Sequence, residues 1–373
     1  MNKWIWALIV IIIVGLGWWA IGFSGNSAQS GTGPIKIGSV LPLTGDAASI
    51  GTIDRAAVEI AVAEINAAGG VNGRQLEMIY EDGQCASTAA SNAANKLMNA
   101  DNVIAIIGGL CSTETATFAP AAMQKKVVVI SPASSAPNLS QTGKYFFRDY
   151  PSDAFQGKFA AEYAYNTLGA RKVAVIYHIS DWGTGIKNVF ETRFKELGGE
   201  IVSESGEPQT ATDYRTDLTK AKAANPDYIY TPMYPQGDTA LMKQASELGI
   251  KAKILGADGW DDPQLAKDAK NLGLDILYTT GKTGTTDAFK QKLQQKTKSP
   301  DVPVGAPQAY DAVYILANAM KSAGTDPDKL ADTIRATKYD GVSGHIEFDQ
   351  NGDLTVADYV VKRMANGTAT VVQ

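Results

Sequence analysis

The sequence predicts an α/β protein built from two doubly wound parallel-sheet lobes. Three observations support this fold class. Short apolar segments rich in β-branched residues alternate with segments of helical periodicity from residue 35 onward. The alternation restarts near residue 154, although the sequence itself does not repeat. The chain has 373 residues, of which 45% are hydrophobic, and this is enough for two domains with separate cores.

The first residues differ from the rest of the chain. Residues 4–23 carry no charge and are almost wholly apolar, with two Trp residues near each end. About 20 apolar residues can span a bilayer, and Trp favours its interfaces, so this segment predicts an N-terminal transmembrane helix. A cleaved signal peptide is the alternative. Either segment exports the chain to the periplasm or cell surface, and a helix would tether it to the cytoplasmic membrane. Residues 24–34 have the composition of a Gly/Ser linker.

The first α/β unit begins at residue 35. Its strands alternate with amphipathic helices, which predicts a parallel sheet with helices on both faces. The predicted strands are residues 35–43, 75–82, 103–109 and 127–131. The predicted helices are residues 50–66, 86–98 and 113–124.

The second unit has the same design. Its predicted helices are residues 154–168, 187–197 and 214–224, with a further helix ending at residue 248. Its predicted strands are residues 172–178, 200–206, 227–233 and 253–258. Ligands of open α/β sheets bind beyond the carboxyl ends of the strands, so the residues that follow each strand are the candidates for a site.

Residues at these strand ends suit one small zwitterion. Small hydroxyl residues follow two strands of the first unit, where helix starts and turns offer hydroxyls and backbone N–H groups to a carboxylate. A carboxylate in the second unit can accept from an ammonium group, and two aromatic residues can cover an aliphatic side chain. Ordinary N-caps and turn residues are the alternative for each polar residue. The candidates are Ser112, Ser134, Ser135, Trp182, Tyr234 and Asp258.

Several other classes of function lack support in the sequence. The formal net charge of −5 and the absence of a basic patch argue against nucleic acid as a partner. His178 and His345, the two histidines, lie far apart in the chain, and we expect each to be structural. No CxxC, HExxH, GxSxG or phosphate-binding GxxxxGK[ST] motif is present. We therefore expect no metal, no cofactor and no enzymatic activity.

Cys85 and Cys111 are the two cysteines of the chain. Each follows the end of a predicted parallel strand, so both are expected at the same edge of one sheet, where a bridge between them is geometrically possible. An exported chain would permit a disulfide. Two buried thiols are the alternative.

Seven motifs follow one another along the chain. They are IKIGSVLPLTGDAASIG, AVAEINAAGGVNGRQLEMIYEDGQC, IGGLCSTETATFAP, VISPASSAPNL, ILGADGW, AYDAVYILANAM and FDQNGDL. This run resembles the branched-chain amino-acid-binding proteins, which are type I periplasmic solute-binding proteins of ATP-binding-cassette importers. The first motif is similar to the family's opening strand and ligand loop, the second to its first helix and second strand, and the next two to its following ligand loops. The likeness covers nearly all of residues 35–373.

For the first unit, the resemblance implies a role for five residues. Ser112 matches the hydroxyl that takes the ligand carboxylate, and Leu110 and Cys111 flank it. Ala133 and Ser135 match the small residue and the hydroxyl of the next ligand loop. The resemblance also implies that the two cysteines form the family disulfide.

For the second unit, the resemblance places the ammonium partner and the aromatic residues. Asp258 stands where leucine-type binders carry a Glu that pairs with the α-ammonium, and it is one methylene shorter. Tyr234 matches an aromatic residue, and Trp182 stands where a Tyr often lies. Ile50 and Gly305 replace aromatic residues near the side-chain pocket, so the resemblance leaves the side chain of the ligand open.

The resemblance further implies two lobes joined by a hinge that the chain crosses three times. Lobe 1 is expected over residues 35–150 plus 282–340, and lobe 2 over residues 151–281 plus 341–373. The expected crossings lie at residues 149–151, 279–282 and 341–344.

The expected function is that of an extracytoplasmic solute receptor. It would capture a leucine-, isoleucine- or valine-like amino acid by hinge closure and deliver it to the membrane permease of an importer. One alternative is a ligand-sensing module of the same fold that regulates a partner protein. Another is a binder of a related amide or small carboxylate.

Overall fold

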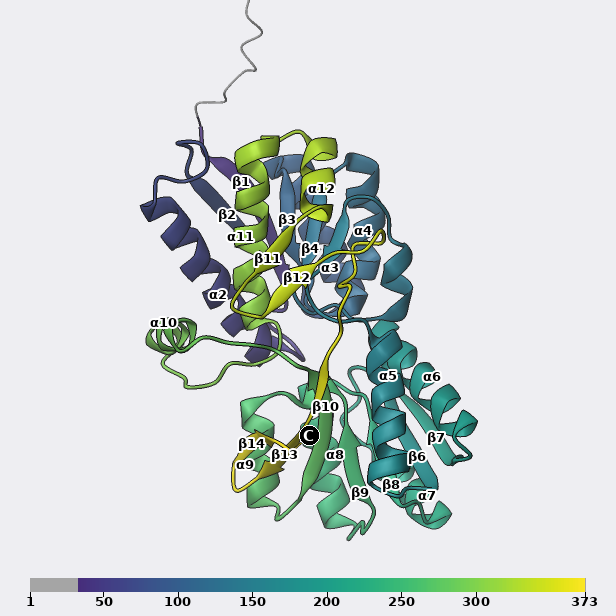
Figure 1. Ribbon diagram of the computed structural model, residues 1–373. Coiled ribbons are helices and arrows are strands. Elements are labelled where there is room, and N and C mark those ends of the chain that lie inside the picture. Colours follow the sequence, from purple (N-terminus) through teal and green to yellow (C-terminus); the bar gives the residue numbers. More distant parts are fainter. Residues whose placement is uncertain (1–32, 373) are drawn as a thin grey trace, which may run out of the picture. The chain divides into compact units, whose positions relative to one another are not determined.

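The computed structural model describes residues 33–372 (Figure 1). The predicted transmembrane helix or signal peptide at residues 4–23 lies outside the described residues, as does nearly all of the predicted linker. Within residues 33–372 no helix is long and apolar enough to cross a membrane. Residues 35–373 form one compact unit, and the fold below is that of this unit.

The first sheet is wholly parallel, with the strand order β2-β1-β3-β4-β5. Its central strands are buried on both faces and rich in Ile and Val, as a parallel sheet covered by helices requires. The strands are β1 (Ile35–Leu41), β2 (Leu76–Asp82), β3 (Ala105–Gly108), β4 (Val128–Ser131) and β5 (Phe146–Arg148).

Helices cover both faces of this first sheet (Figure 1). One apolar core lies under α2 (Ala48–Ala67), α10 (Asp287–Thr297), α11 (Ala306–Ala323) and α12 (Pro327–Arg335). A second core lies under α3 (Ser87–Lys96) and α4 (Ser112–Lys125). Helices α10, α11 and α12 come late in the sequence, so the chain returns to this lobe after it has formed most of the other.

The second sheet has the strand order β14-β13-β10-β9-β8-β6-β7. Five of its strands run parallel, and the last two join one edge as antiparallel strands. The strands are β6 (Lys172–Ile179), β7 (Glu200–Pro208), β8 (Tyr228–Thr231), β9 (Lys253–Gly256), β10 (Ile276–Gly281), β13 (Tyr359–Ala365) and β14 (Thr368–Val371).

Two groups of helices cover the second sheet, one on each face. The first group is α5 (Asp153–Glu162) and α6 (Asp181–Glu196). The second is α7 (Arg215–Ala224), α8 (Pro235–Glu247) and α9 (Pro263–Asn271). The described chain therefore contains two separately covered sheets, as expected from the restart of the α/β pattern.

We propose that the third crossing between the lobes comes later in the chain than the expected residues 341–344. The small sheet of β11 (Lys338–Asp340) and β12 (His345–Glu347) packs on the first lobe, because Ile346 and Phe348 belong to the core under α11. The second sheet resumes only at Tyr359. We therefore propose lobe 1 as residues 35–150 plus 282–354, lobe 2 as the remainder, and the third crossing at residues 355–358.

Candidate functional site

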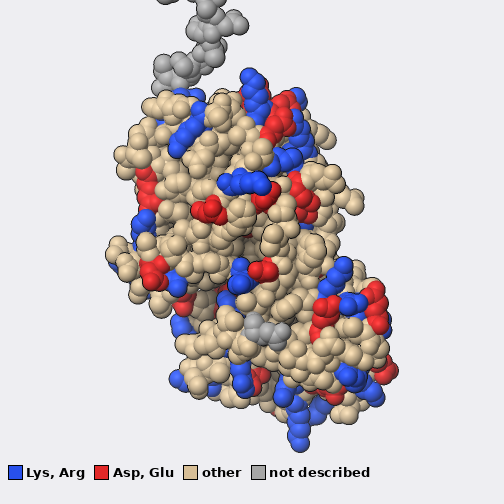
Figure 2. All heavy atoms as spheres, in the orientation of Figure 1, with Lys and Arg blue, Asp and Glu red and all other residues tan. Residues whose placement is uncertain are grey.

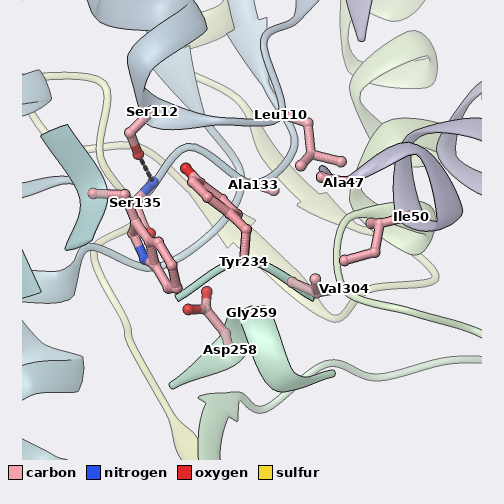
Figure 3. A pocket seen from close by; sticks show the side chains of 11 residues that line it. Ala47, Ile50, Leu110, Ser112, Ala133, Ser135, Tyr234, Asp258, Gly259 and Val304 are labelled. Atoms are coloured by element: carbon pink, nitrogen blue, oxygen red, sulfur yellow. Dashed lines mark hydrogen bonds between the residues drawn. The ribbon is translucent and has the colours of Figure 1, made fainter. Parts of the chain in front are cut away.

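A pocket lies where the carboxyl ends of both sheets face one another (Figure 3). The residues that line it come from the starts of helices or from the turns before them. The space not filled by atoms is about 360 Å³ and includes open solvent, and about 30 Å³ of it can hold the centre of a water molecule. The lining residues are Ala47, Ile50, Leu110, Ser112, Ala133, Ser135, Trp182, Tyr234, Asp258, Gly259 and Val304.

Polar and apolar groups separate within the pocket. Figure 3 shows the hydroxyls of Ser112 and Ser135 and the carboxylate of Asp258 toward one end. Ile50 and Val304 lie at the opposite end. The pocket can therefore receive a molecule with charged groups at one end and an aliphatic group at the other.

Ser112 is the first residue of α4 and is buried. Its Oγ accepts hydrogen bonds from the backbone N–H groups of Ser135 and Ala136, each at 3.1 Å. A hydroxyl oxygen accepts two such bonds and still has its own proton to donate. Ser112 therefore offers a free O–H donor beside the positive end of the α4 dipole, which suits an anion.

Glu114 and the disulfide hold the loop before α4. The Oε2 atom of Glu114 accepts from the backbone N–H groups of Leu110 and Cys111, both at 3.0 Å, and Oε1 accepts from that of Cys85 at 3.0 Å. Burial raises the pKa of Glu114 to about 8, while the three N–H bonds act in the opposite direction. The disulfide between Cys85 and Cys111 is present, so the alternative of two thiols is wrong.

Asp258 lies in the turn that follows β9, at the start of a short 3₁₀ helix, and its side chain is buried. Its Oδ1 atom has no hydrogen-bond partner within residues 33–372. Burial raises the pKa of Asp258 to about 7, and hydrogen bonds from Tyr150 and Gln156 oppose that rise. A buried carboxylate with an unpaired oxygen is costly unless a cation or a proton neutralises it.

The hydroxyl oxygen of Ser135 can accept a hydrogen bond from a group in the pocket. The sequence did not indicate this role. The Ser135 hydroxyl donates its proton to Oδ2 of Asp153 at 2.7 Å, so lone pairs of its oxygen remain. Asp153 is the first residue of α5 and is fully buried. Burial and the neighbouring charge of Asp258 raise the pKa of Asp153 well above its usual value. The side of the pocket near Asp258 is therefore rich in acceptors.

Trp182 and Tyr234 form the aromatic wall of the pocket. Their ring centroids are 4.8 Å apart at an interplanar angle of 35°, and both side chains are buried. Gly259 is packed against the tip of the Trp182 indole, where a Cβ atom would lie 2.9 Å from the ring. The hydroxyl of Tyr234 has no hydrogen-bond partner, so its position depends on packing and on the backbone.

Seven of the nine predicted site residues line the pocket, and two do not. Ser134 faces inward, where its hydroxyl bonds the carbonyl oxygen of Gly109 at 2.9 Å and the hydroxyl of Thr115 at 2.7 Å. Cys111 is turned away from the pocket by its disulfide to Cys85. Ser134 and Cys111 therefore do not line the pocket, and a contact of either residue with a ligand stays a prediction.

Sequence reasoning missed three lining residues. Ala47 and Val304 line the pocket next to Ile50, which was expected there, and Gly259 follows Asp258. A small residue three positions before a predicted helix was the available signal for Ala47. Val304 carried no such signal, because it reaches the pocket through the late return of the chain to the first lobe.

Surface charge is mixed in sign. Figure 2 shows basic and acidic side chains interspersed over one face of the molecule. Among the described residues, no group of three or more His, Cys, Asp or Glu side chains is arranged to hold a metal ion.

Comparison with known proteins gives concordant results. The family model described as "Periplasmic binding protein" matches residues 34–369. A leucine-, isoleucine-, valine-, threonine- and alanine-binding protein of Pseudomonas aeruginosa is 29% identical over 350 residues, which cover 91% of this chain and 92% of that protein.

Two crystal structures are similar over the whole fold. One is a leucine binding protein from Thermotoga maritima, with 31% identity, a TM-score of 0.85 and coverage of 91% of this chain and 98% of that one. The other is a branched-chain amino acid transporter substrate binding protein from Streptococcus pneumoniae in complex with isoleucine, with 30% identity, a TM-score of 0.82 and coverage of 91% and 99%. The fold, the facing strand ends and these matches together show that the chain belongs to the periplasmic binding protein family, whose members are extracytoplasmic solute-binding proteins and not enzymes.

Proposed function

We propose that this chain captures a leucine-, isoleucine- or valine-like amino acid outside the cytoplasm and delivers it to the permease of an ATP-binding-cassette importer. The names of the relatives support this ligand class. One observation carries the proposal. A hydroxyl with a free proton at a helix start and a buried carboxylate with an unpaired oxygen line the same pocket.

The amino acid lies with its charged groups at the polar end of the pocket. Its carboxylate accepts the free proton of Ser112 at the start of α4. Its ammonium group donates to Asp258 and to the oxygen of Ser135, whose own proton is already held by Asp153. Trp182 and Tyr234 flank the aliphatic side chain.

The far end of the pocket selects an apolar side chain. Ala47, Ile50, Leu110 and Val304 carry no polar side-chain atoms. A charged or amide side chain placed there would lose its hydration without gaining a partner. The pocket therefore favours branched aliphatic amino acids over polar ones of similar size.

Binding proceeds by hinge closure. The space that admits the centres of water molecules is about 30 Å³, enough for roughly two of them. The residues that line the pocket are all buried, so little of their surface is accessible in this arrangement. The lobes must separate about the three crossings for the ligand to enter, and they close again around it.

The chain acts at the membrane surface in this proposal. The apolar segment at residues 4–23 tethers it, or directs its export, and residues 24–34 give the receptor reach toward the permease.

Calorimetric titration with leucine tests the proposed site. The variant Asp258→Asn is expected to bind leucine at least about tenfold more weakly, because the ammonium group loses its counter-charge. Titration with 4-methylpentanoate, which lacks the ammonium group, sharpens the test: the wild type should strongly prefer leucine, and Asp258→Asn should lose most of that preference.

The matched control is Asp287→Asn, which removes an exposed carboxylate far from the pocket at the start of α10. It should bind leucine as the wild type does. Unchanged leucine affinity in folded Asp258→Asn would refute the proposed role of this residue. A wild-type protein that binds no branched-chain amino acid would refute the proposed function.

A further inference from the structure

His178 stands at the end of β6, fully buried behind the aromatic wall of the pocket. Its Nδ1 atom lies 3.2 Å from the backbone nitrogen of Tyr234, and its Nε2 atom lies 2.9 Å from the hydroxyl oxygen of Tyr214. The family comparison and the proposed ligand contacts leave this ring without a role.

The hydrogen bonds around the ring can be assigned from chemistry alone. A backbone N–H group only donates, so Nδ1 must be the acceptor for Tyr234 and carries no proton. The ring proton is therefore on Nε2, which donates to the Tyr214 oxygen. The Tyr214 hydroxyl in turn donates a hydrogen bond to the carbonyl oxygen of Ala211 at 3.1 Å. Every group in this series is satisfied only when His178 is neutral.

The ring of His178 is also fixed sterically. A Cβ atom added at Gly237, in the first turn of α8, would collide with Nε2 of His178. The ring of Tyr234 lies on another side, with its centroid 6.0 Å away. Burial lowers the pKa of His178 to about 4, in agreement with a neutral ring.

Tyr234 depends on this support because its other end is unanchored. Its hydroxyl has no hydrogen-bond partner, and its backbone is the N-cap of α8. The bond to His178 fixes the backbone from which the ring projects toward Trp182. The same series of hydrogen bonds ends in the segment before α7, from which Gln209 donates to the carbonyl oxygen of Cys85 in the first lobe at 3.2 Å.

We propose that His178 is a positioning residue of the ligand site. As a neutral ring protonated on Nε2, it fixes Tyr234 against Trp182 and so sets the preference of the pocket for a bulky aliphatic side chain. This inference rests on the proposed function, because it concerns the same pocket. It predicts that loss of the Nδ1 acceptor weakens the binding of leucine more than that of alanine, whose short side chain makes less contact with the aromatic wall.

Two substitutions separate positioning from simple core packing. In His178→Leu the volume is largely kept but the acceptor for Tyr234 is lost, whereas in His178→Asn the amide oxygen can take the place of Nδ1. Leucine and alanine affinities are measured by calorimetry on the full chain. We expect the leucine-to-alanine preference to fall at least about fivefold in His178→Leu and to stay within about twofold of the wild type in His178→Asn.

A purely structural role would lower the melting temperature of both variants and leave the leucine-to-alanine preference unchanged. That result, or equal loss of preference in both variants, would overturn the proposal. If His178→Leu does not fold, Tyr214→Phe serves instead, because it removes the acceptor for Nε2–H and frees the ring to change tautomer. Tyr214→Phe is expected to lower the preference about twofold or more, and an unchanged preference would count against the proposal.

The tautomer itself can be observed without any ligand. The chain has two histidines, so long-range nitrogen–proton spectra of the full chain can assign His178 by comparison with the His345→Gln variant. A neutral ring with its proton on Nε2 at neutral pH is expected. A ring protonated on Nδ1 would refute the inference even if the wild type binds leucine as proposed. A protein that binds no amino acid would refute the proposed function and the role of His178 in ligand preference, but not the assigned tautomer.

Discussion

The ionisation of His178 links the pocket to the stability of the fold. In the unfolded chain this side chain has a pKa of about 6.5, and burial lowers it to about 4 in the folded protein. Between these values the unfolded state binds more protons, so stability falls as pH decreases. Above about pH 6.5 the ionisation of His178 does not reduce the free energy of unfolding. By about pH 4 it has lowered that free energy by roughly 3 kcal/mol.

Chemical denaturation of the wild type and of His178→Asn, at about pH 7 and about pH 4.5, measures this linkage. The acidic groups Glu114 and Asp258 have raised pKa values and act with the opposite sign, but they are present in both proteins and cancel in the difference. The stability advantage of the wild type over His178→Asn should shrink at the lower pH. A difference that stays constant would contradict the assigned burial of a neutral ring.

Single residues of the site could be predicted where a polar side chain suited to a charged ligand also followed the carboxyl end of a strand. Ser112 and Asp258 are polar residues directly after buried strands, and both line the pocket. Ser134 has the same chemistry, yet its hydroxyl is used inside the first lobe. Which way a side chain of a loop points depends on backbone geometry that the order of residue types does not specify.

At the level of elements, the alternation of strands and helices predicted both sheets. Each strand and each helix buries an apolar face, and the pattern of that face lies within its own short segment of sequence. No individual helix or strand after residue 258 was predicted. Strands β11 and β12 have three residues each, and their positions depend on contacts with the distant first lobe, such as that between Phe348 and Phe147 with ring centroids 5.3 Å apart. Their short sequences carry too little periodicity for assignment.

The disulfide is the covalent support of the elements that carry Ser112. It joins the segment after β2 to the start of α4, across 26 residues. The double variant Cys85→Ala/Cys111→Ala should lose about 3–4 kcal/mol of unfolding free energy, because its unfolded chain regains loop freedom. Guanidinium denaturation of the oxidised wild type and of the double variant measures the difference.

Wild-type protein unfolded in the presence of a reductant is the matched control, since it lacks the bond but keeps both cysteines. It should resemble the double variant to within about 1 kcal/mol. Equal stability of the oxidised wild type and the double variant would show that the bridge does not constrain the unfolded chain.

At the level of the whole unit of residues 35–373, direct hydrogen bonds hold the lobes in the closed arrangement. The hydroxyl of Ser49, at the start of α2 in the first lobe, donates to Oδ2 of Asp262 in the second lobe at 2.5 Å. The other carboxylate oxygen of Asp262 caps α9. Gln209 adds the contact to Cys85 described above. Separation of the proposed lobes would break these bonds, so we expect them to add to the free energy of closure and not to the choice of ligand.

Removing the Ser49 hydroxyl should therefore weaken every ligand equally. In Ser49→Ala, closure loses one hydrogen bond to a carboxylate at the rim, about 1 kcal/mol, which corresponds to an affinity about fivefold lower. The factor should be the same for leucine, isoleucine and alanine, because Ser49 is not among the residues that line the pocket.

Thr52→Ala is the matched control: its hydroxyl lies one turn further along α2 and bonds only within that helix, to the carbonyl oxygens of Ala48 and Ser49. Small-angle scattering without ligand should show a larger radius of gyration for Ser49→Ala than for Thr52→Ala, and the two should agree at saturating leucine. A change in the leucine-to-alanine preference of Ser49→Ala would mean that the rim contact shapes the pocket itself, contrary to a closure that acts on the lobes as whole bodies.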